Sequence, residues 1–416
     1  MIEDLIQSAQ TEFDLTERGH QESLIRLAEE LVGVSEPISE ILERTASGEV
    51  PLEARIAALL ADSRRWLLDY EGEPIRIAVV YAMWGEQNRL RPKSPENPAG
   101  EDSLATKLEQ LEWATKGTRI DWHLYAVDDG CPHGSGRLAQ EIADQHPLRD
   151  RVSVLNLEQA LPAESGPLQK LKSVDDSRKA GAVILGCIAA LESRADAVIY
   201  TDADNSVPLG QIGLLLRPFV ESASPVVLGD RKRVGSVLVK EAARWGIGIK
   251  VLRHMQRMIG KAIFSRGILD TQAAFKLYES QLLRKIIEDP TVFDFSFDTD
   301  WILAAIRSEV EISQIPFAFV DSAAESASIT QGPMTTWETL LFGLAKAVKR
   351  HGFCESEAAE MVGVLEEEIE DYRDLEKIID RLPPELEKAG EEDFGNPEVM
   401  SPERLRSWLR EVLQSN

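Results

Sequence analysis

Apolar runs of strand length alternate with helical segments between residues 75 and 320, and this alternation is the feature that most constrains the fold. The helical segments carry apolar residues at three- and four-residue spacing, which is typical of amphipathic helices. Such alternation predicts an α/β protein built of βαβ units, with a mainly parallel sheet. The predicted strands are residues 75–83, 120–130, 152–157, 196–204, 225–231, 272–278 and 311–320.

Helical patterns flank this central region on both sides. With 416 residues the chain is longer than one average domain, so two or three structural parts are expected. We predict a helical extension over residues 1–72, an α/β domain over 73–330, and an acidic helical extension over 331–416.

The overall charge and the cysteines indicate the surroundings of the protein. The net charge of -25 argues against general nucleic-acid binding, which needs a basic surface. The three scattered cysteines, Cys131, Cys187 and Cys354, form no disulfide framework and indicate a reducing compartment. The N-terminal residues lack the features of a signal peptide, and the longest apolar run, 180–191, is too short to span a bilayer. We therefore expect a cytoplasmic protein without a transmembrane segment.

Acidic residues follow two of the predicted strands. Asp202 and Asp204 end the run "DAVIYTDAD", and Asp128-Asp129 end "IDWHLYAVDD". If Asp202 and Asp204 share one side of an extended chain, about 5 Å apart, they repel by roughly 3 kcal/mol at an effective dielectric near 20. Ligands of open α/β sheets bind beyond the carboxyl ends of the strands. The acids are therefore either solvated turn residues or part of a site in which a divalent cation and substrate phosphates offset their charge.

Seven motifs then follow one another in a familiar order. This run resembles the inverting family 2 glycosyltransferases with the GT-A fold, particularly the dolichyl- and polyprenyl-phosphate sugar transferases, over roughly residues 75–330. The chain departs from the family where Cys131 replaces a serine and where Gly-Lys-Gly becomes Arg178-Lys179-Ala180. The matching segments are "VVYAMWGEQNRL", "YAVDDGCPHGSG", "SRKAGAVILGCIAAL", "IYTDADNSVPLGQI", "VVLGDRKR", "DTQAAFKLY" and "FSFDTDWILAAI".

The resemblance implies a GT-A sheet with helices on both faces and a metal-dependent hexosyltransferase that takes a sugar from a UDP- or GDP-sugar, with inversion. It implies that Asp202 and Asp204 hold Mg²⁺ or Mn²⁺ through the donor diphosphate. The other implied donor-binding residues are Glu86, Asp128, Asp129, Lys179, Arg231 and Gln272.

The resemblance further implies that Asp270 and Asp298 are catalytic. Asp270 would face the sugar or the acceptor, and Asp298 would act as a base toward a hydroxyl acceptor or would position groups around a phosphate acceptor. Asp294 and Asp300 compete with Asp298 for this role, and Asp298 or Thr299 could instead cap a helix.

The acceptor stays open between a lipid phosphate and a small anion such as a glycerate. Residues 229–276 contain 11 Lys or Arg against three acidic residues. Within them, 245–266 reads as a basic amphipathic helix that could lie on an anionic membrane, line a phosphate site, or pack on the core with a solvated face. A nucleotidyltransferase and a non-catalytic sugar-nucleotide-binding protein are the alternative functions. The sequence shows no P-loop, no dinucleotide-binding glycine motif and no nucleophile elbow, which disfavours a kinase, dehydrogenase or hydrolase.

Overall fold

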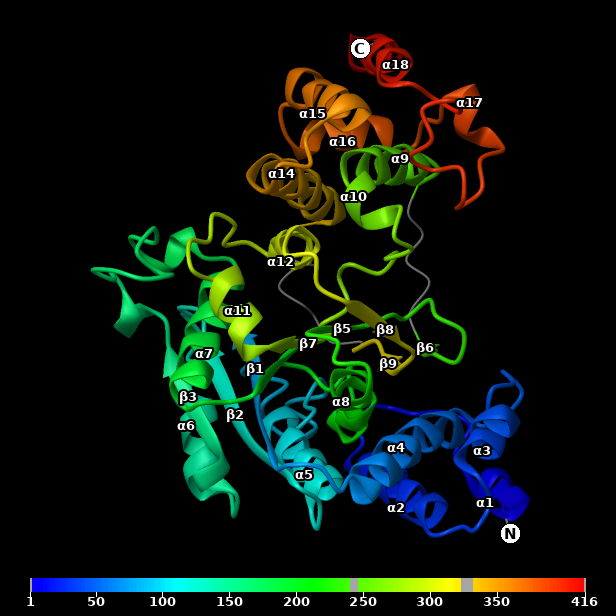
Figure 1. Ribbon diagram of the computed structural model, residues 1–416, viewed down its shortest axis with the longest axis vertical. Coiled ribbons are helices and arrows are strands. Elements are labelled where there is room, and N and C mark those ends of the chain that lie inside the picture. The colour runs from blue at the N-terminus through cyan, green and yellow to red at the C-terminus, as the bar shows by residue number, and fades with distance from the viewer. Residues whose placement is uncertain (1, 240–245, 323–331, 415–416) are drawn as a thin grey trace. The chain divides into compact units, whose positions relative to one another are not determined.

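The computed structural model describes residues 2–239, 246–322 and 332–414, and the chain divides into two compact units (Figure 1). Unit 1 comprises Met1–Glu241, Ala273–Pro290 and Val310–Ala324. Unit 2 comprises Ala242–Gln272, Thr291–Glu309 and Glu325–Asn416. The three-part division at residues 72 and 330 stays a prediction.

Unit 1 is built on a seven-stranded sheet in the order β3-β2-β1-β4-β7-β5-β8. All neighbouring strands are parallel except that β7 runs antiparallel to both β4 and β5, so the predicted mainly parallel sheet is confirmed. The two strands of a smaller sheet, β6 and β9, are parallel. The strands are β1 Ile75–Met83, β2 Ile120–Asp128, β3 Val152–Asn156, β4 Ala197–Thr201, β5 Val226–Gly229, β6 Val237–Val239, β7 Phe275–Glu279, β8 Ile312–Ile315 and β9 Ala318–Val320.

Several predicted strands differ from the observed ones at their ends, and two of the differences change the interpretation. The run predicted over 311–320 is two strands, β8 and β9, interrupted at Pro316, whose ring nitrogen has no hydrogen to donate to a ladder. The run predicted over 196–204 ends at Thr201, so Asp202 and Asp204 lie in a loop and the same-side geometry of an extended strand does not apply to them.

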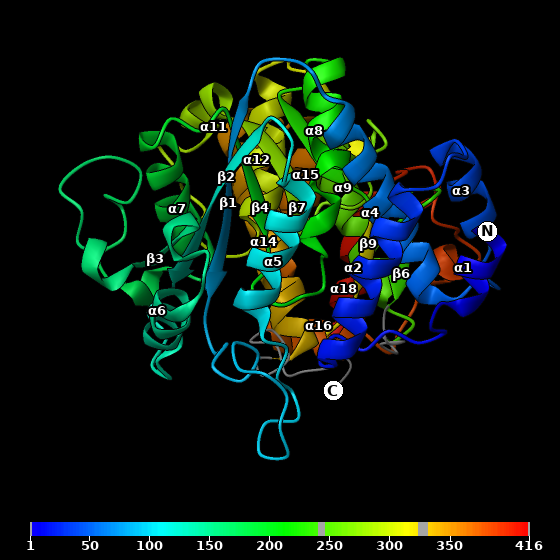
Figure 2. The same cartoon turned by 90° about the horizontal axis from the view of Figure 1, so that it is seen from below.

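Helices cover both faces of the sheet. Alternate residues of β1, such as Val79 and Tyr81, lie in one core cluster with Leu108 of α5, while Val80 points to α7 on the other face. Figure 2 shows α7 on one side of β1 and α5 on the other. The helices of unit 1 are α1 Ile2–Ser8, α2 Arg18–Val32, α3 Ile38–Thr45, α4 Leu52–Asp69, α5 Ser103–Thr115, α6 Ser135–Gln145, α7 Ala180–Glu192, α8 Ile212–Glu221 and α11 Ser280–Ile286. Short 3-10 turns occupy Arg149–Arg151, Glu158–Ala160, Val174–Asp176 and Leu209–Gln211.

The helical N-terminal segment predicted from the sequence is present as α1–α4 and belongs to unit 1. Its apolar side chains, among them Leu24 of α2 and Leu60 of α4, are fully buried in the same cluster as the β1 residues. The hydroxyl of Ser63 on α4 donates to the carbonyl of Gly210 at 2.8 Å, which ties this segment to the turn before α8.

In the described residues unit 2 is helical, and the predicted helical C-terminal extension is present. Its helices α14 and α12 pack together, and α15 packs on α9 and α18. The bounds are α9 Ile249–Ile259, α10 Lys261–Phe264, α12 Phe297–Arg307, α14 Pro333–His351, α15 Ser356–Glu368, α16 Tyr372–Ile378, α17 Pro384–Glu387 and α18 Pro402–Gln414.

The basic side chains of α9 contact the acidic C-terminal segment of the same unit. Lys250 Nζ donates to the carbonyls of Glu387 at 2.8 Å and Ala389 at 3.0 Å. Arg253 and Arg257 both pair with the carboxylate of Glu391.

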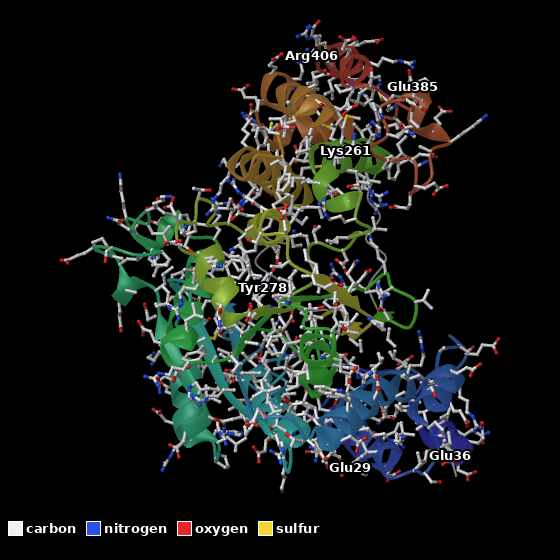
Figure 3. All side chains as sticks on the ribbon, viewed as in Figure 1. Glu29, Glu36, Lys261, Tyr278, Glu385 and Arg406 are labelled. Carbon is white, nitrogen blue, oxygen red and sulfur yellow. The ribbon has the colours of Figure 1, made fainter. Side chains whose placement is uncertain are left out.

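Lys261, labelled in Figure 3, lies 3.3 Å from a carboxylate oxygen of Glu357. Residue 245, the first of the predicted membrane-contacting helix 245–266, lies outside the described residues, and that membrane contact stays a prediction. Among the residues that the structure describes, we find no helix with the length and hydrophobicity needed to cross a bilayer.

Candidate active site

The acidic loops predicted to converge follow three neighbouring strands. β1 lies between β2 and β4 and is parallel to both, so their carboxyl ends share one edge of the sheet. The loop with Glu86 follows β1, Asp128 ends β2 and Asp129 comes directly after it, and Asp202 and Asp204 follow β4. This edge is where open α/β sheets bind ligands.

Lys179 connects the acids of β2 to those of β4. Its backbone N–H donates to Asp129 Oδ2 at 2.6 Å, and its Nζ lies 2.5 Å from Asp202 Oδ1. Ser177 Oγ donates to the other oxygen of Asp129, also at 2.6 Å. Asp129 therefore fixes the turn before α7, and this turn presents the Lys179 ammonium to Asp202.

The backbone of Lys179 adopts an unfavourable conformation, with φ 87° and ψ -51° at the N-cap of α7. Only glycine adopts positive φ readily, and the family pattern has glycines on both sides of its lysine here. This chain holds the same turn with a side chain in place, through the two hydrogen bonds to Asp129.

The ion pair between Lys179 and Asp202 sets the charge of both groups. Burial alone would lower the pKa of Lys179, but Asp202 outweighs it and holds this pKa well above its usual range. Burial alone would raise the pKa of Asp202, but Lys179 outweighs it and lowers this pKa. The two side chains are 33% and 30% exposed, so a ligand can reach the charges.

Asp128 is more enclosed. Burial is the main cause that raises the pKa of its carboxyl to about 6, and hydrogen bonds from backbone N–H groups oppose it. Asn156 Nδ2 donates to Asp128 at 3.4 Å, and a Cβ at Gly136 would lie 2.7 Å from the Asp128 Cβ. Glycine is therefore required at 136 for the start of α6 to approach Asp128 so closely.

Two buried lysines, which the sequence analysis missed, support the loop of Asp202 and Asp204. Lys107 of α5 is fully buried, and its Nζ donates to the backbone carbonyl of Asp204. Lys276 of β7 is fully buried too, and its Nζ lies 5.8 Å from the ring centroid of Tyr200 at the end of β4. After Lys179, both lysines contribute to the lowered pKa of Asp202.

The sequence carries only a weak signal for these two residues. A lysine in an amphipathic helix such as α5 is expected on the solvated face, where its charge costs nothing. Lys276 lies inside the apolar run "AAFKLY" of a predicted strand, and this position was the one available clue to its burial.

Further acids surround Asp204. Burial is the main cause that raises the pKa of Glu86, and Asp204 and Asp202 raise it further, while Arg89, 2.8 Å from Glu86 Oε2, opposes the shift. Burial and Asp204 likewise raise the pKa of Glu101, whose carboxylate accepts from the Asn205 N–H at 2.8 Å. The acids of this loop therefore interact with the buried ammonium groups of Lys107 and Lys276 and also with the nearby carboxyl groups of Glu86 and Glu101.

The carboxylates of Asp202 and Asp204 could bind a hard cation only if a bound ligand supplied further oxygen atoms. Asp204 Oδ1 accepts a hydrogen bond from the Ser206 N–H at 3.1 Å, and Asp202 is paired with Lys179. Within the described ranges, no three His, Cys, Asp or Glu side chains are grouped as a metal site. Two carboxylates are what Mg²⁺ or Mn²⁺ needs from a protein when phosphate oxygens and water supply the other ligands.

The remaining predicted residues lie elsewhere. Arg231 follows β5 in unit 1, and its guanidinium lies 5.0 Å from the ring centroid of Phe319. Asp270, Gln272 and Asp298 belong to unit 2 and are described there by themselves. Asp270 and Asp298 are buried, and Gln272 Nε2 lies 3.5 Å from Thr271 Oγ1.

The three acids around α12 have different contacts. The carboxylate of Asp300 is bound by Arg350 at 2.5 Å and by His351 Nε2 at 2.9 Å, which ties α12 to α14. Asp294 accepts from the Ser296 N–H at 2.8 Å. The predicted capping role of Asp298 or Thr299 is wrong, because Ser296 is the N-cap residue and Asp298 lies in the first turn.

Comparison with known proteins supports the resemblance in the sequence. No established protein-family model matches the chain. It is 22% identical over 256 residues to a dolichyl-phosphate beta-glucosyltransferase of Trichomonas vaginalis, covering 59% of this chain and 66% of that protein. It is 25% identical over 205 residues to a polyprenol monophosphomannose synthase of Mycolicibacterium smegmatis, covering 48% and 67%. The chain thus spans about two thirds of the length of these relatives.

Solved structures show a looser similarity. A glucosyl-3-phosphoglycerate synthase of M. tuberculosis is 13% identical with a TM-score of 0.45, over 72% of this chain and 86% of that one. The order of the motifs and the curated relatives agree, and the chain is similar to dolichyl- and polyprenyl-phosphate sugar transferases.

Proposed function

We propose that this protein is a metal-dependent glycosyltransferase that moves a sugar, with inversion, from a nucleoside diphosphate sugar to an acceptor that carries a phosphate. The observation that carries the proposal is the connection of Asp129 to Asp202 through Lys179, at the shared carboxyl ends of β2 and β4. The names of two relatives support the class of acceptor, since one contains dolichyl phosphate and the other a polyprenol monophosphate product.

On this proposal Lys179 is the residue that receives the donor diphosphate. Its ammonium is one-third exposed and lies next to the Asp202 carboxylate, so it can bind a phosphate oxygen while it stays near Asp202. Arg231 is proposed as a second phosphate contact, since a guanidinium suits bidentate binding of phosphate. Asp128, Asp129 and Glu86 are proposed for the nucleoside side of the donor.

Asp202 and Asp204 would hold Mg²⁺ or Mn²⁺ jointly with the diphosphate. The bound cation would neutralise charge on the departing nucleoside diphosphate. Lys107, which binds the Asp204 carbonyl, and Lys276 are both buried, and both contribute to the lowered pKa of Asp202.

The acceptor determines what Asp298 does. A phosphate acceptor is already a nucleophilic anion and needs no base, so Asp298 would then orient groups, whereas a hydroxyl acceptor would give its proton to Asp298. Asp270 and Gln272 are proposed to face the sugar or the acceptor. We also propose a cytoplasmic location, which the free thiols of Cys131, Cys187 and Cys354 support.

A ligand screen followed by a transfer assay tests the proposal. We expect a UDP- or GDP-sugar to raise the melting temperature, and to raise it further with Mn²⁺, because a ligand of the native state stabilises it by mass action. Asp204→Ala should lower transfer by a factor of about 100 or more, given that the charge stabilisation from a bound metal is worth several kcal/mol. Asp150→Ala, which removes an exposed carboxylate of unit 1, is the matched control.

The outcomes separate the candidate functions. Transfer to a polyprenyl phosphate, or to a small phosphorylated or carboxylated acceptor, identifies which anion is used. Donor binding without transfer or hydrolysis, unchanged in Asp204→Ala, would contradict the proposal and favour a non-catalytic sugar-nucleotide-binding protein.

A further inference from the structure

Unit 1 contains a cavity that none of the proposed active-site residues lines. It lies between α3, α4, α8 and the segment from Val234 to Val237, with a volume of about 340 Å³. This volume falls in the range of about 300–1,000 Å³ that is usual for small-molecule sites. The cavity therefore has room for an organic ligand rather than for a few water molecules.

Apolar side chains form most of its wall. Leu42 of α3, Leu59 of α4 and Leu214 of α8 line it, and Ile315 and Pro316 complete this surface. An apolar lining with a few polar groups is typical of sites that bind organic molecules by their body and orient them by one polar end.

The polar groups of the cavity carry a net positive charge. Asp62 is paired with Arg217 at 2.7 Å, which leaves Arg55 as the further charged residue of the lining. In the described part of the chain, the Nε of Arg55 is buried and has no hydrogen-bond partner. Buried N–H groups nearly always have a partner in folded proteins, so this nitrogen is available to an acceptor from a bound ligand.

We propose that this cavity is a second binding site, for a small ligand with an apolar body and one anionic group that binds Arg55. The anionic group is a carboxylate, sulfonate or phosphate, because the uncompensated charge of the lining is positive and a guanidinium pairs with such oxyanions. This proposal does not depend on the transferase activity.

The cavity is lined in part by the chain segment that follows β5. Val234 to Val237 belong to the segment that follows β5, which also carries Arg231. Val234 is 97% exposed, so the segment offers an apolar side chain at the surface beside the cavity. A ligand in the cavity contacts the same stretch of chain that holds the proposed phosphate contact.

Two dyes that differ in one charge test the proposal on the full-length chain. 1-Anilinonaphthalene-8-sulfonate has an apolar body and a sulfonate, and N-phenyl-1-naphthylamine is its counterpart without the sulfonate. We expect saturable binding of the sulfonate by fluorescence titration, weakened about tenfold or more in Arg55→Met, because a charge-assisted hydrogen bond is lost. The uncharged dye should bind wild type and Arg55→Met equally.

Further variants separate the site from other effects. Leu42→Trp puts a larger side chain into the cavity and should weaken both dyes without altering the arginine. Arg284→Met removes an exposed charge on α11 and should leave both affinities unchanged. Circular dichroism and melting temperature establish that each variant is folded. Equal sulfonate affinity in wild type and Arg55→Met, or dye binding that Leu42→Trp does not weaken, would overturn the proposal.

Discussion

At the scale of single residues, the conformation of Lys179 is the feature with the clearest energetic consequence. A non-glycine residue at positive φ costs on the order of 1–3 kcal/mol, and the turn accepts this cost because the Lys179 ammonium must reach Asp202. The strain and the ion pair belong to the same residue and can be separated by substitution.

We predict that Lys179→Gly is more stable than Lys179→Ala by about 1 kcal/mol, because both lose the ion pair but only glycine relieves the strain. Urea unfolding followed by circular dichroism measures the difference. The same two substitutions at Arg284, inside helix α11, should have the opposite order, since glycine weakens a helix. If alanine is the better residue at both positions, the strain at Lys179 is not real.

The sequence identified the residues of the site that fall in motifs and missed those that do not. Asp129, Lys179 and Asp202 follow strands or open a helix, so their chemistry could be inferred from position. Lys107 could not be predicted, because its burial depends on the Asp204 carbonyl, which is almost a hundred positions away in the chain and adjacent only in the folded sheet.

At the scale of elements, the fit of α7 against the sheet determines where its N-terminal turn lies. A Cβ at Gly186 would lie 2.4 Å from Val80 Cγ1 of β1 and 3.1 Å from Val127 Cγ2 of β2. We predict that Gly186→Ala lowers the free energy of unfolding by about 1–3 kcal/mol, because overpacking outweighs the gain in helix propensity, and that it weakens donor binding through Lys179.

Thermal unfolding and donor titration check this prediction. Gly19→Ala on α2 is the matched control, since no atom lies within 4 Å of the added Cβ there, and it should be neutral or slightly stabilising. Equal stability of Gly186→Ala and wild type would show that α7 can shift without cost.

In unit 2, His254 ties α9 to the chain before α18. Its Nδ1 accepts from the Gly395 N–H at 3.1 Å, and its Nε2 lies 2.8 Å from the Met400 carbonyl. The ring is therefore neutral, with its proton on Nε2, and burial lowers the pKa of His254. A group whose pKa is lowered by folding binds protons more weakly in the folded state than in the unfolded state. The free energy of unfolding therefore falls as the pH drops below the histidine pKa of the unfolded chain, about 6.5.

We predict that, between pH 7.5 and 5.5, the free energy of unfolding falls further in the wild type than in His254→Gln, because glutamine does not titrate. The expected difference is about 1 kcal/mol for each pH unit over which His254 is protonated in the unfolded state but not in the folded state. Urea unfolding at both pH values measures the difference, and the variant corrects for carboxylates that titrate in the same range. The same pH dependence in both proteins would contradict the assignment.

Elements with a clear hydrophobic pattern were predicted more accurately than the others. β1 was predicted residue for residue because a buried run ends in the turn at Trp84 and Gly85. The antiparallel direction of β7 could not be predicted, because an apolar run contains no information about which way it enters a sheet. The predicted end of β4 lay too far along the chain, because polar residues at alternate positions, such as the acids after Thr201, are compatible with a strand.

At the scale of the whole molecule, the charge of -25 coexists with a basic helix whose arginines are already paired. The exposed Arg253–Glu391 pair contributes little to stability, but both pairs reduce the positive charge that α9 presents. We predict that Glu391→Gln increases binding to phosphatidylserine vesicles at low salt by about fivefold or more, since each basic residue freed near an anionic surface is worth about 1 kcal/mol.

Co-sedimentation with vesicles measures this effect, and salt should abolish it by screening. Glu398→Gln, an equal change of charge at an exposed position, is the control. If the two variants bind alike, the pairing of α9 has no influence on membrane contact, and the predicted contact through 245–266 loses its basis.

The interleaving of the two units in the chain has a consequence for biosynthesis. β7 separates β4 from β5 in the sheet, yet more than forty residues lie between β5 and β7 in the chain, most of them in unit 2. While the ribosome produces that stretch, β4 and β5 have no neighbour between them, and bare strand edges of this kind attract other chains. A nascent polypeptide halted there would therefore depend on chaperones, and truncation before residue 275 would yield an aggregating fragment rather than a smaller enzyme.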